Sequence, residues 1–145
     1  MNHYIQEIQI DSAEKIEFMN VTEKVKEEVK KSRIKKGLVT VFTQHTTTAI
    51  AINENEERLI RDLKCFLEKH APMNCCYEHD DLEHRDVPED EQVNGHSHLK
   101  SLLMSASENI PLADSGMLLG KWQSIFFVEL DGPRKRKLIV QVIGE

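Results

Sequence analysis

Strand-forming segments dominate the chain after Pro111, and they constrain the fold more than any other feature of the sequence. Apolar and β-branched residues fill positions 117–119, 122–130 and 137–143, as expected for buried strands. Asp131-Gly132-Pro133 marks a turn between the last two, because these residue types favour chain reversal. The sequence therefore predicts a sheet in this part of the chain.

Helical patterns are fewer and come earlier. Asn20 and Glu23 form a capping-box pattern before valines at helical spacing, and a short helix is expected over residues 97–107. Asn53 or Asn55 precedes the clearest apolar stripe, which consists of Leu59, Ile60, Leu63, Phe66 and Leu67. The helices are too few for a doubly wound sheet. We therefore expect one α+β domain over residues 1–145, built around an antiparallel or mixed sheet.

Composition excludes several classes of protein. The net charge of −6 argues against general nucleic-acid binding, which relies on basic side chains. No apolar run approaches the roughly 20 residues of a membrane-spanning helix, and the N-terminus lacks a signal-peptide pattern. The cysteines Cys65, Cys75 and Cys76 are odd in number and form a poor disulfide framework, so a reducing cytoplasm is expected.

Residues 73–93 are rich in Asp and Glu and show little periodicity. A loop of this length in a compact domain is usually either functional or disordered. Composition alone favours disorder, whereas the embedded Tyr77, His79 and His84 favour a functional loop.

Three histidines from distant segments lie in polar surroundings: His45 before three threonines, His79 among acids, and His98 after His96 and Ser97. Three imidazoles are the minimum protein set for a metal site with an open position. Two of them also have a simpler explanation, because His45 can be a core residue and His79 a surface residue whose protonated form is stabilised by the neighbouring carboxylates. In a helix His96 and His98 point apart, so one metal could not bind both, and spacing alone does not choose between them.

Other polar residues fit the binding of a phosphate. Thr46 and Thr47 offer hydroxyls and backbone donors, and Arg134 and Arg136 would share one face of a strand, although a solvated basic strand end is the commoner outcome. Asp90 could position a cation or act as an acid or base, but solvated loop carboxylates are more common. Two more candidates, Asn53 as a ligand-binding side chain and Gln123 at a strand start, are also explained by helix capping and by the strand itself.

Several segments together resemble the YjbQ family, also called the uncharacterised protein family UPF0047. They are Gln44-His45-Thr46-Thr47-Thr48-Ala49 with Asn53-Glu54, Tyr77-Glu78-His79-Asp80, Asp86-Val87-Pro88-Glu89-Asp90, Asn94, His98-Leu99-Lys100, Leu118-Leu119-Gly120-Lys121-Trp122-Gln123, Glu129 and Asp131-Gly132-Pro133-Arg134-Lys135-Arg136. The resemblance spans nearly the whole chain, in order. One departure is Ser105, which stands where the family often has glycine.

The resemblance implies an α+β domain with a β-sandwich core and two or three helices, usually assembled as a homotrimer. It also implies thiamine phosphate synthase activity, as a main or a secondary role, in which a pyrimidine-methyl diphosphate joins a thiazole phosphate and pyrophosphate leaves. By position, the family's recurrent histidines map to His45, His79 and His98, which favours His98 over His96.

The resemblance thus implies a transferase that acts on small phosphorylated substrates, and the residues supply a mechanism for it. Arg134, Arg136, Thr46 and Thr47 would stabilise the charge that grows on the diphosphate. A divalent ion, zinc or magnesium, would be held by His45, His79 and His98. His45 and His98 would act in catalysis with Glu129 or Asp90 in support, and Asn53 and Gln123 would contact the substrate.

Two other functions stay open. Three imidazoles would leave room for a metal-bound water, which suits a metal-dependent hydrolase of a small phosphorylated metabolite. A trimeric protein that binds an anion or metal without turnover is the third hypothesis, because no clear nucleophile and base pair is visible.

Overall fold

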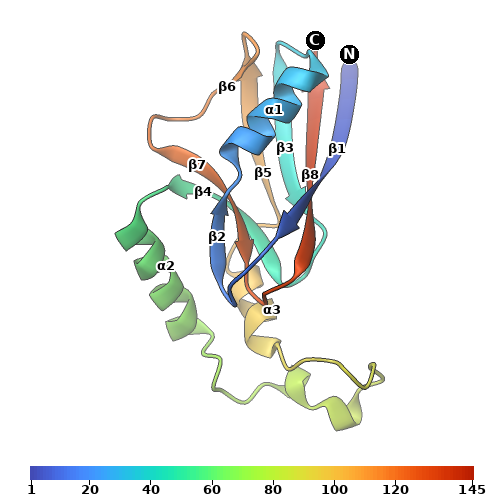
Figure 1. Ribbon diagram of the computed structural model, residues 1–145, viewed down its shortest axis with the longest axis vertical. Coiled ribbons are helices and arrows are strands. Elements are labelled where there is room, and N and C mark those ends of the chain that lie inside the picture. The colour runs from blue at the N-terminus through green and yellow to red at the C-terminus, as the bar shows by residue number, and fades with distance from the viewer.

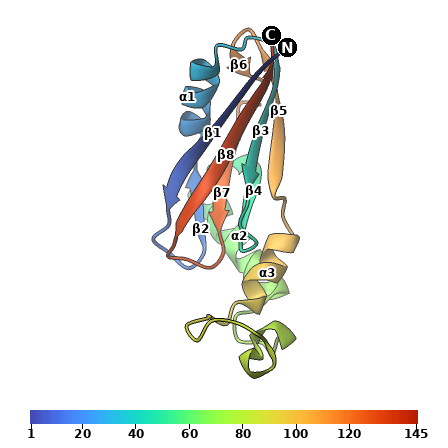
Figure 2. The same cartoon turned by 90° about the vertical axis from the view of Figure 1, so that its right-hand side faces the viewer.

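Two antiparallel sheets form the centre of the computed structural model, which describes residues 1–145 (Figure 1). The larger sheet has five strands in the order β1-β8-β3-β5-β6. Their bounds are Asn2–Asp11 for β1, Lys135–Gly144 for β8, Gly37–Thr43 for β3, Ser107–Ala113 for β5 and Gly116–Met117 for β6. The first and last long strands of the chain are therefore neighbours, and the two termini lie at the same end of the molecule (Figure 2).

The smaller sheet has three strands in the order β2-β7-β4, with β7 (Gln123–Glu129) between β2 (Glu17–Asn20) and β4 (Thr48–Glu54). Strand β7 is hydrophobic on both faces, since Ile125, Phe126, Phe127 and Val128 are all buried. Ile125 and Phe127 pack with residues of the larger sheet, whereas Phe126 and Val128 pack on the opposite side with Leu67 and neighbouring side chains. The smaller sheet is thus covered on both faces, which explains the continuous apolar run in its central strand.

Helix α1 (Thr22–Ser32) buries Val25 and Val29 in the core between the sheets, as its spacing predicts. The expected capping box is not formed. Instead, the Asn20 side chain accepts hydrogen bonds from the backbone N–H and the hydroxyl of Thr22, at 3.0 and 2.6 Å.

Helix α2 (Glu57–His70) lies along the outer side of the smaller sheet, where it buries Leu67 (Figure 1). Its first turn is capped by the carboxylate of Glu56, which accepts from the backbone N–H groups of Arg58 and Leu59, so neither predicted asparagine is the cap.

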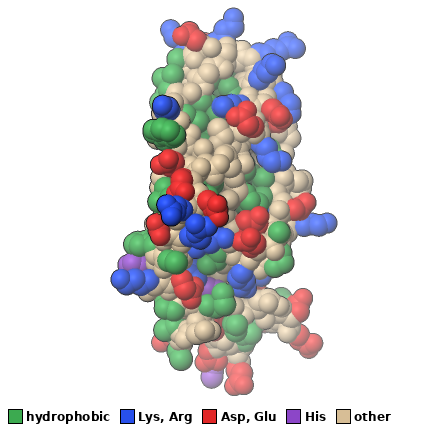
Figure 3. All heavy atoms as spheres, turned by 60° about the vertical axis from the view of Figure 1, so that its left-hand side comes forward, with side chains coloured by type: hydrophobic (Ala, Val, Ile, Leu, Met, Phe, Trp, Pro, Cys, Tyr) green, Lys and Arg blue, Asp and Glu red, His purple; other side chains and the backbone are tan.

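The acidic segment folds below the sheets as two 3₁₀ turns, Glu78–Asp80 and Leu82–His84, and acidic side chains gather at this end of the molecule (Figure 3). Helix α3 (Gly95–Leu102) follows; it ends before the predicted residue 107, where β5 already begins, and it starts earlier than the sequence predicts. The reason is a contact from outside the helix, because Asp80 Oδ1 accepts from the backbone N–H groups of Asn94 and Gly95, at 3.0 and 2.8 Å. A carboxylate here also complements the helix dipole.

The predicted α+β fold with a β-sandwich core and three helices is confirmed, and every strand pairing is antiparallel rather than mixed. The helices are too short or too polar for any of them to cross a membrane.

Candidate functional site

A pocket of about 260 Å³, here called the polar pocket, lies where the turn before β4, the acidic segment, α3 and the β7–β8 turn meet. No hydrophobic residue lines it. The ten lining residues are Thr46, Thr47, His79, Arg85, Glu91, Asn94, His98, Asp131, Arg134 and Arg136. Distant parts of the sequence thus contribute cationic and hydrogen-bonding side chains to one small space.

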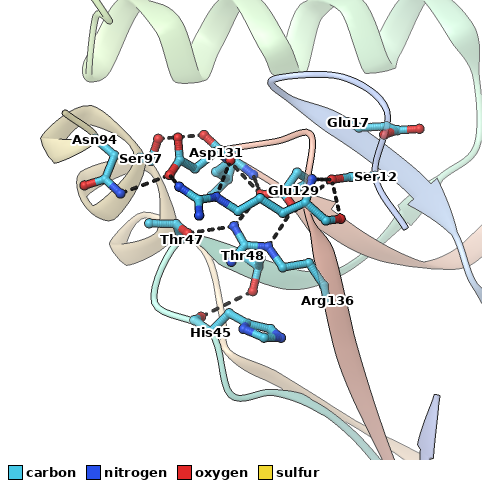
Figure 4. Close-up of polar contacts among 12 residues, drawn as sticks. Ser12, Glu17, His45, Thr47, Thr48, Asn94, Ser97, Glu129, Asp131 and Arg136 are labelled. Atoms are coloured by element: carbon cyan, nitrogen blue, oxygen red, sulfur yellow. Dashed lines mark hydrogen bonds and ion pairs between the residues drawn. The ribbon is translucent and has the colours of Figure 1, made fainter. Parts of the chain in front are cut away.

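Arg136 is held in this pocket by a buried ion pair with Glu129 (Figure 4). Its Nε and Nη2 donate to the two carboxylate oxygens of Glu129, at 2.8 and 2.7 Å, and Nη2 also donates to Thr47 Oγ1 at 2.8 Å. The Glu129 side chain is fully buried, and it accepts further hydrogen bonds from Ser12 Oγ and from the backbone of Leu130 and Asp131. Glu129 therefore orients Arg136 and has no oxygen free for proton transfer.

The charge state of Glu129 follows from these contacts. Burial raises the pKa of its carboxyl, but the hydrogen bonds from Arg136, the Asp131 amide and Ser12 outweigh burial and leave the pKa below its usual value. Glu129 is accordingly ionised at neutral pH, and the buried pair carries opposite charges.

Asp131 organises the opposite wall of the pocket. Its Oδ2 accepts from Asn94 Nδ2 at 2.9 Å and from Arg134 Nη2 at 2.8 Å, and its Oδ1 accepts from Lys15 Nζ at 2.8 Å. Burial raises the pKa of Asp131, yet the bonds from Lys15, Asn94 and Arg134 lower it overall. The carboxylate is ionised and already compensated, so it fixes the positions of its partners.

Each of the three arginines of the polar pocket is held by hydrogen bonds to the protein, and each keeps guanidinium N–H groups that have no protein partner. Arg134 uses Nε and Nη2 on Asp131, and Arg136 uses Nε and Nη2 on Glu129 and Thr47, which leaves Nη1 in both. Arg85 uses only Nη1, which donates to the His79 carbonyl at 2.7 Å. Guanidinium groups held in this way present fixed N–H donors, as the recognition of an oxyanion requires.

His79 and His98 lie together in the pocket, with ring centroids 4.5 Å apart and ring planes inclined by 66°. Burial is the largest cause that lowers the pKa of His98, and the neighbouring His79 and Arg85 lower it further, against the opposing effect of Asp131. His98 is therefore neutral at pH 7 and offers a lone pair.

His45 lies in a neighbouring pocket of about 440 Å³, here called the side pocket, which shares Thr46 and His98 with the polar pocket. Its Nε2 accepts from the backbone N–H of Lys137 at 2.9 Å. Burial and the nearby Arg136 lower the pKa of His45, so this ring is also neutral at pH 7.

The predicted trio of metal-binding histidines is brought together only in part. His79 and His98 are in contact, whereas His45 uses Nε2 on the backbone and no group of three or more His, Cys, Asp or Glu side chains is placed to hold a metal ion. The contact between His79 and His98 is one of ring edge to ring face, and it does not by itself arrange their nitrogens around a metal ion. A site made of all three histidines is therefore not formed within one chain.

Three further candidates lie outside the polar pocket. Asp90 lines an adjacent pocket with Lys15 and Arg134. Asn53 and Gln123 lie at the far ends of β4 and β7, where their side-chain oxygens accept from the backbone N–H groups of Glu54 and Gly120. The structure therefore does not bring Asn53 or Gln123 to the pocket that contains the predicted Thr46, Thr47, Arg134 and Arg136.

The prediction of site residues missed Arg85, Glu91, Asn94 and Asp131, all of which line the polar pocket. Asn94 and Asp131 stand in the segments that carry the family resemblance, so their signal was present in the sequence. For Arg85 the only signal in the sequence was a positive charge within an otherwise acidic segment.

Comparison with known proteins identifies the family. The model of the family described as "UPF0047 protein YjbQ-like" matches residues 6–145. The chain belongs to the YjbQ family. A UPF0047 protein of Methanothermobacter thermautotrophicus is 38% identical over 145 residues, which cover 100% of this chain and 95% of that protein.

Solved structures agree with this membership of the YjbQ family. A YbjQ-like protein of unknown function from Sulfolobus solfataricus superposes with a TM-score of 0.90 at 32% identity, covering 99% of each chain. An uncharacterised YjbQ/UPF0047 protein from Clostridium acetobutylicum gives 0.84 at 34% identity, covering 95% of this chain and 99% of that chain.

The expected thiamine phosphate synthase activity is wrong. The relatives are described as UPF0047 proteins or as proteins of unknown function, and none is described as acting in thiamine synthesis. Thiamine phosphate synthase is an enzyme of a different fold and family. The transfer of a diphosphate ester therefore does not explain the pocket, whose chemistry follows from its own geometry.

Proposed function

We propose that the polar pocket binds the phosphate group of a small phosphorylated metabolite. The observation that carries the proposal is the set of three anchored guanidinium groups, from Arg85, Arg134 and Arg136, around a space without hydrophobic side chains. Planar guanidinium groups match the oxygens of a phosphate, and fixed donors lose little conformational entropy on binding.

The charge balance of the pocket also favours an anion. Asp131 is neutralised by Lys15 and Arg134, and the charge of Arg136 is balanced by Glu129 behind it. Arg85 makes no ion pair, and the exposed Thr46 adds a hydroxyl and a backbone N–H at the rim. Glu91 adds a negative charge to the lining, so Lys15 and the three arginines exceed the carboxylates Asp131, Glu129 and Glu91 by one positive charge. A phosphate group would therefore meet a net positive charge and several hydrogen-bond donors.

Titration calorimetry with inorganic phosphate tests the binding site. We expect binding to the native chain and an affinity reduced by roughly tenfold or more in Arg134→Ala, since a hydrogen bond to a charged group contributes about 1.5–3 kcal/mol. Lys135→Ala is the matched control, because it removes the neighbouring positive charge from a residue that does not line the pocket. Absence of phosphate binding, or equal losses in the two variants, would contradict the proposal.

A second candidate is metal-assisted hydrolysis of the bound phosphate ester, which the contact between His79 and His98 favours. A divalent ion would polarise a phosphate oxygen or acidify a water molecule. Two imidazoles from one chain would hold such an ion only with ligands from the substrate or from water. Elemental analysis and a hydrolysis screen with and without chelator test this candidate, and phosphate release that survives both chelator and His98→Ala would refute it.

We retain the homotrimer as a proposal. Exposed apolar side chains support an assembly of some kind, among them Trp122 and Leu118 with 65% and 60% of their surface exposed. Light scattering on the purified chain measures its oligomeric state, and a monomeric mass would refute the trimer.

We also propose a cytoplasmic location. Cys65, Cys75 and Cys76 are all free and exposed, as suits a reducing compartment. Cell fractionation tests this proposal.

A further inference from the structure

The side pocket differs in chemistry from the polar pocket that it adjoins. It is lined by the hydrophobic residues Phe42, Leu102, Met104 and Ala106 and by uncharged polar residues and histidines, and no Asp, Glu, Lys or Arg lines it. Thr46 and His98 line both pockets, so the two spaces meet at these residues. One molecule can therefore occupy both.

The apolar wall of the side pocket is available to a ligand. Leu102 is 82% exposed and Phe42 is 37% exposed, although both are large hydrophobic side chains. Water around such side chains is released when an apolar group covers them, which makes contact with an organic group favourable. A phosphate bound alone in the polar pocket would leave this surface in water.

We infer that the ligand is a phosphate ester of an apolar alcohol, aromatic or short-chain aliphatic, whose organic group lies in the side pocket against Phe42 and Leu102. This inference rests on the proposed function, since it places the phosphate in the polar pocket. Both pockets are large enough for this ligand, because about 260 Å³ is more than a phosphate needs and about 440 Å³ leaves room for a group of one or two rings.

His45 adds a polar contact at the inner side of this pocket. A neutral imidazole has one acceptor and one donor nitrogen, and Nε2 already accepts from Lys137. Nδ1 of His45 therefore carries the hydrogen. An acceptor atom on the organic group, such as an ether oxygen or a ring nitrogen, can receive a hydrogen bond from it.

Two phosphonates separate the contribution of the organic group from that of the phosphate. Phenylphosphonate and methylphosphonate share the anionic group and resist hydrolysis, and at a pH at which both are dianions they differ mainly in the apolar group. By calorimetry on the full chain we expect phenylphosphonate to bind at least about tenfold more tightly, equivalent to ~1.4 kcal/mol. Leu102→Asn should reduce this ratio several-fold, with Phe42 retaining the rest, whereas Leu103→Asn, at an exposed leucine outside the pocket, should leave it unchanged.

The outcomes distinguish this inference from the function on which it rests. If inorganic phosphate and both phosphonates fail to bind, the proposed phosphate site is wrong. If all three bind with equal affinity, the phosphate site stands and the apolar ligand is refuted. The inference is also refuted if Leu102→Asn changes the mass found by light scattering but not the ratio of phosphonate affinities, because Leu102 would then belong to an interface between copies.

Discussion

Arg136 shows how single residues of this chain build a binding site from buried charge. The Glu129 carboxylate uses both oxygens on five donors, two from Arg136 and the others from Ser12, Leu130 and Asp131. Such a pair contributes little to stability overall, because the removal of two charges from water offsets their attraction. Its evident effect is to fix the guanidinium group at the wall of the polar pocket.

Replacement of Glu129 by Gln should destabilise the protein by about 3–5 kcal/mol at pH 7, because it leaves the Arg136 charge buried and uncompensated. The pKa of Glu129 is lowered in the folded protein, so its contribution is complete above the unfolded-state value of about 4.3 and is lost as the pH falls below it. Denaturant unfolding at several pH values should therefore show a smaller loss between pH 7 and pH 3 in Glu129→Gln than in the native chain.

The control for this substitution is Glu23→Gln, which breaks an exposed ion pair with Lys26. We expect a change below about 1 kcal/mol there, as for other surface pairs. Similar losses in the two variants would show that the Glu129 pair is not the buried, fixed contact described above.

Histidine roles show what residue types alone can and cannot predict. Polar neighbours in the sequence pointed to His45, His79 and His98, and all three line one of two adjoining pockets. Their pairing could not be predicted, because it depends on where the acidic segment folds. Arg85 could not be predicted as a site residue for the same reason, because its position depends on how the acidic segment folds against the sheets.

At the level of elements, the pattern of apolar residues predicted α1, α2, β7 and β8, because their apolar stripes or runs are visible in the local sequence. It did not predict β5, whose first residue, Ser107, lies where the helix was expected to end. The start of α3 escaped this reasoning. Asp80, from an earlier part of the chain, fixes the start of α3 by accepting hydrogen bonds from the backbone N–H groups of Asn94 and Gly95. A cap supplied by a distant residue has no signature in the sequence next to the helix.

Asp80 also ties the acidic segment to α3, and its replacement tests that link. Asp80→Ala should lower the unfolding free energy by about 1 kcal/mol, as the loss of a helix cap does, and should speed hydrogen exchange at the Asn94 and Gly95 amides. Because Arg85 reaches the polar pocket from this segment, phosphate affinity should fall as well. Asp81→Ala is the control, and equal exchange rates in the two variants would contradict the cap.

On the scale of the whole molecule, the chain consists of a sandwich and a smaller region of α2, α3 and the acidic segment outside it (Figure 2). Lys100 of α3 connects the two helices of this region. Its side chain is completely buried, and Nζ lies 2.7 Å from Oε2 of Glu68 on α2, whose side chain is 46% exposed. Local patterns did not predict this contact, since a lysine on a short helix is usually exposed to solvent.

Because Lys100 is buried and Glu68 is partly exposed, we expect mutations of the two residues to lower the free energy of unfolding by different amounts. Glu68→Gln should cost about 2 kcal/mol, because the buried ammonium group loses the carboxylate that compensates its charge, although partial exposure of Glu68 moderates the loss. Lys100→Met should cost less, because methionine fills a similar volume without charge and water can solvate the free Glu68 carboxylate. Denaturant unfolding of both variants measures the difference. If Lys100→Met is the more destabilising variant, this expectation is wrong. The attraction between Lys100 and Glu68 would then exceed the cost of removing the ammonium group from water, and it would be the contact that joins α3 to α2.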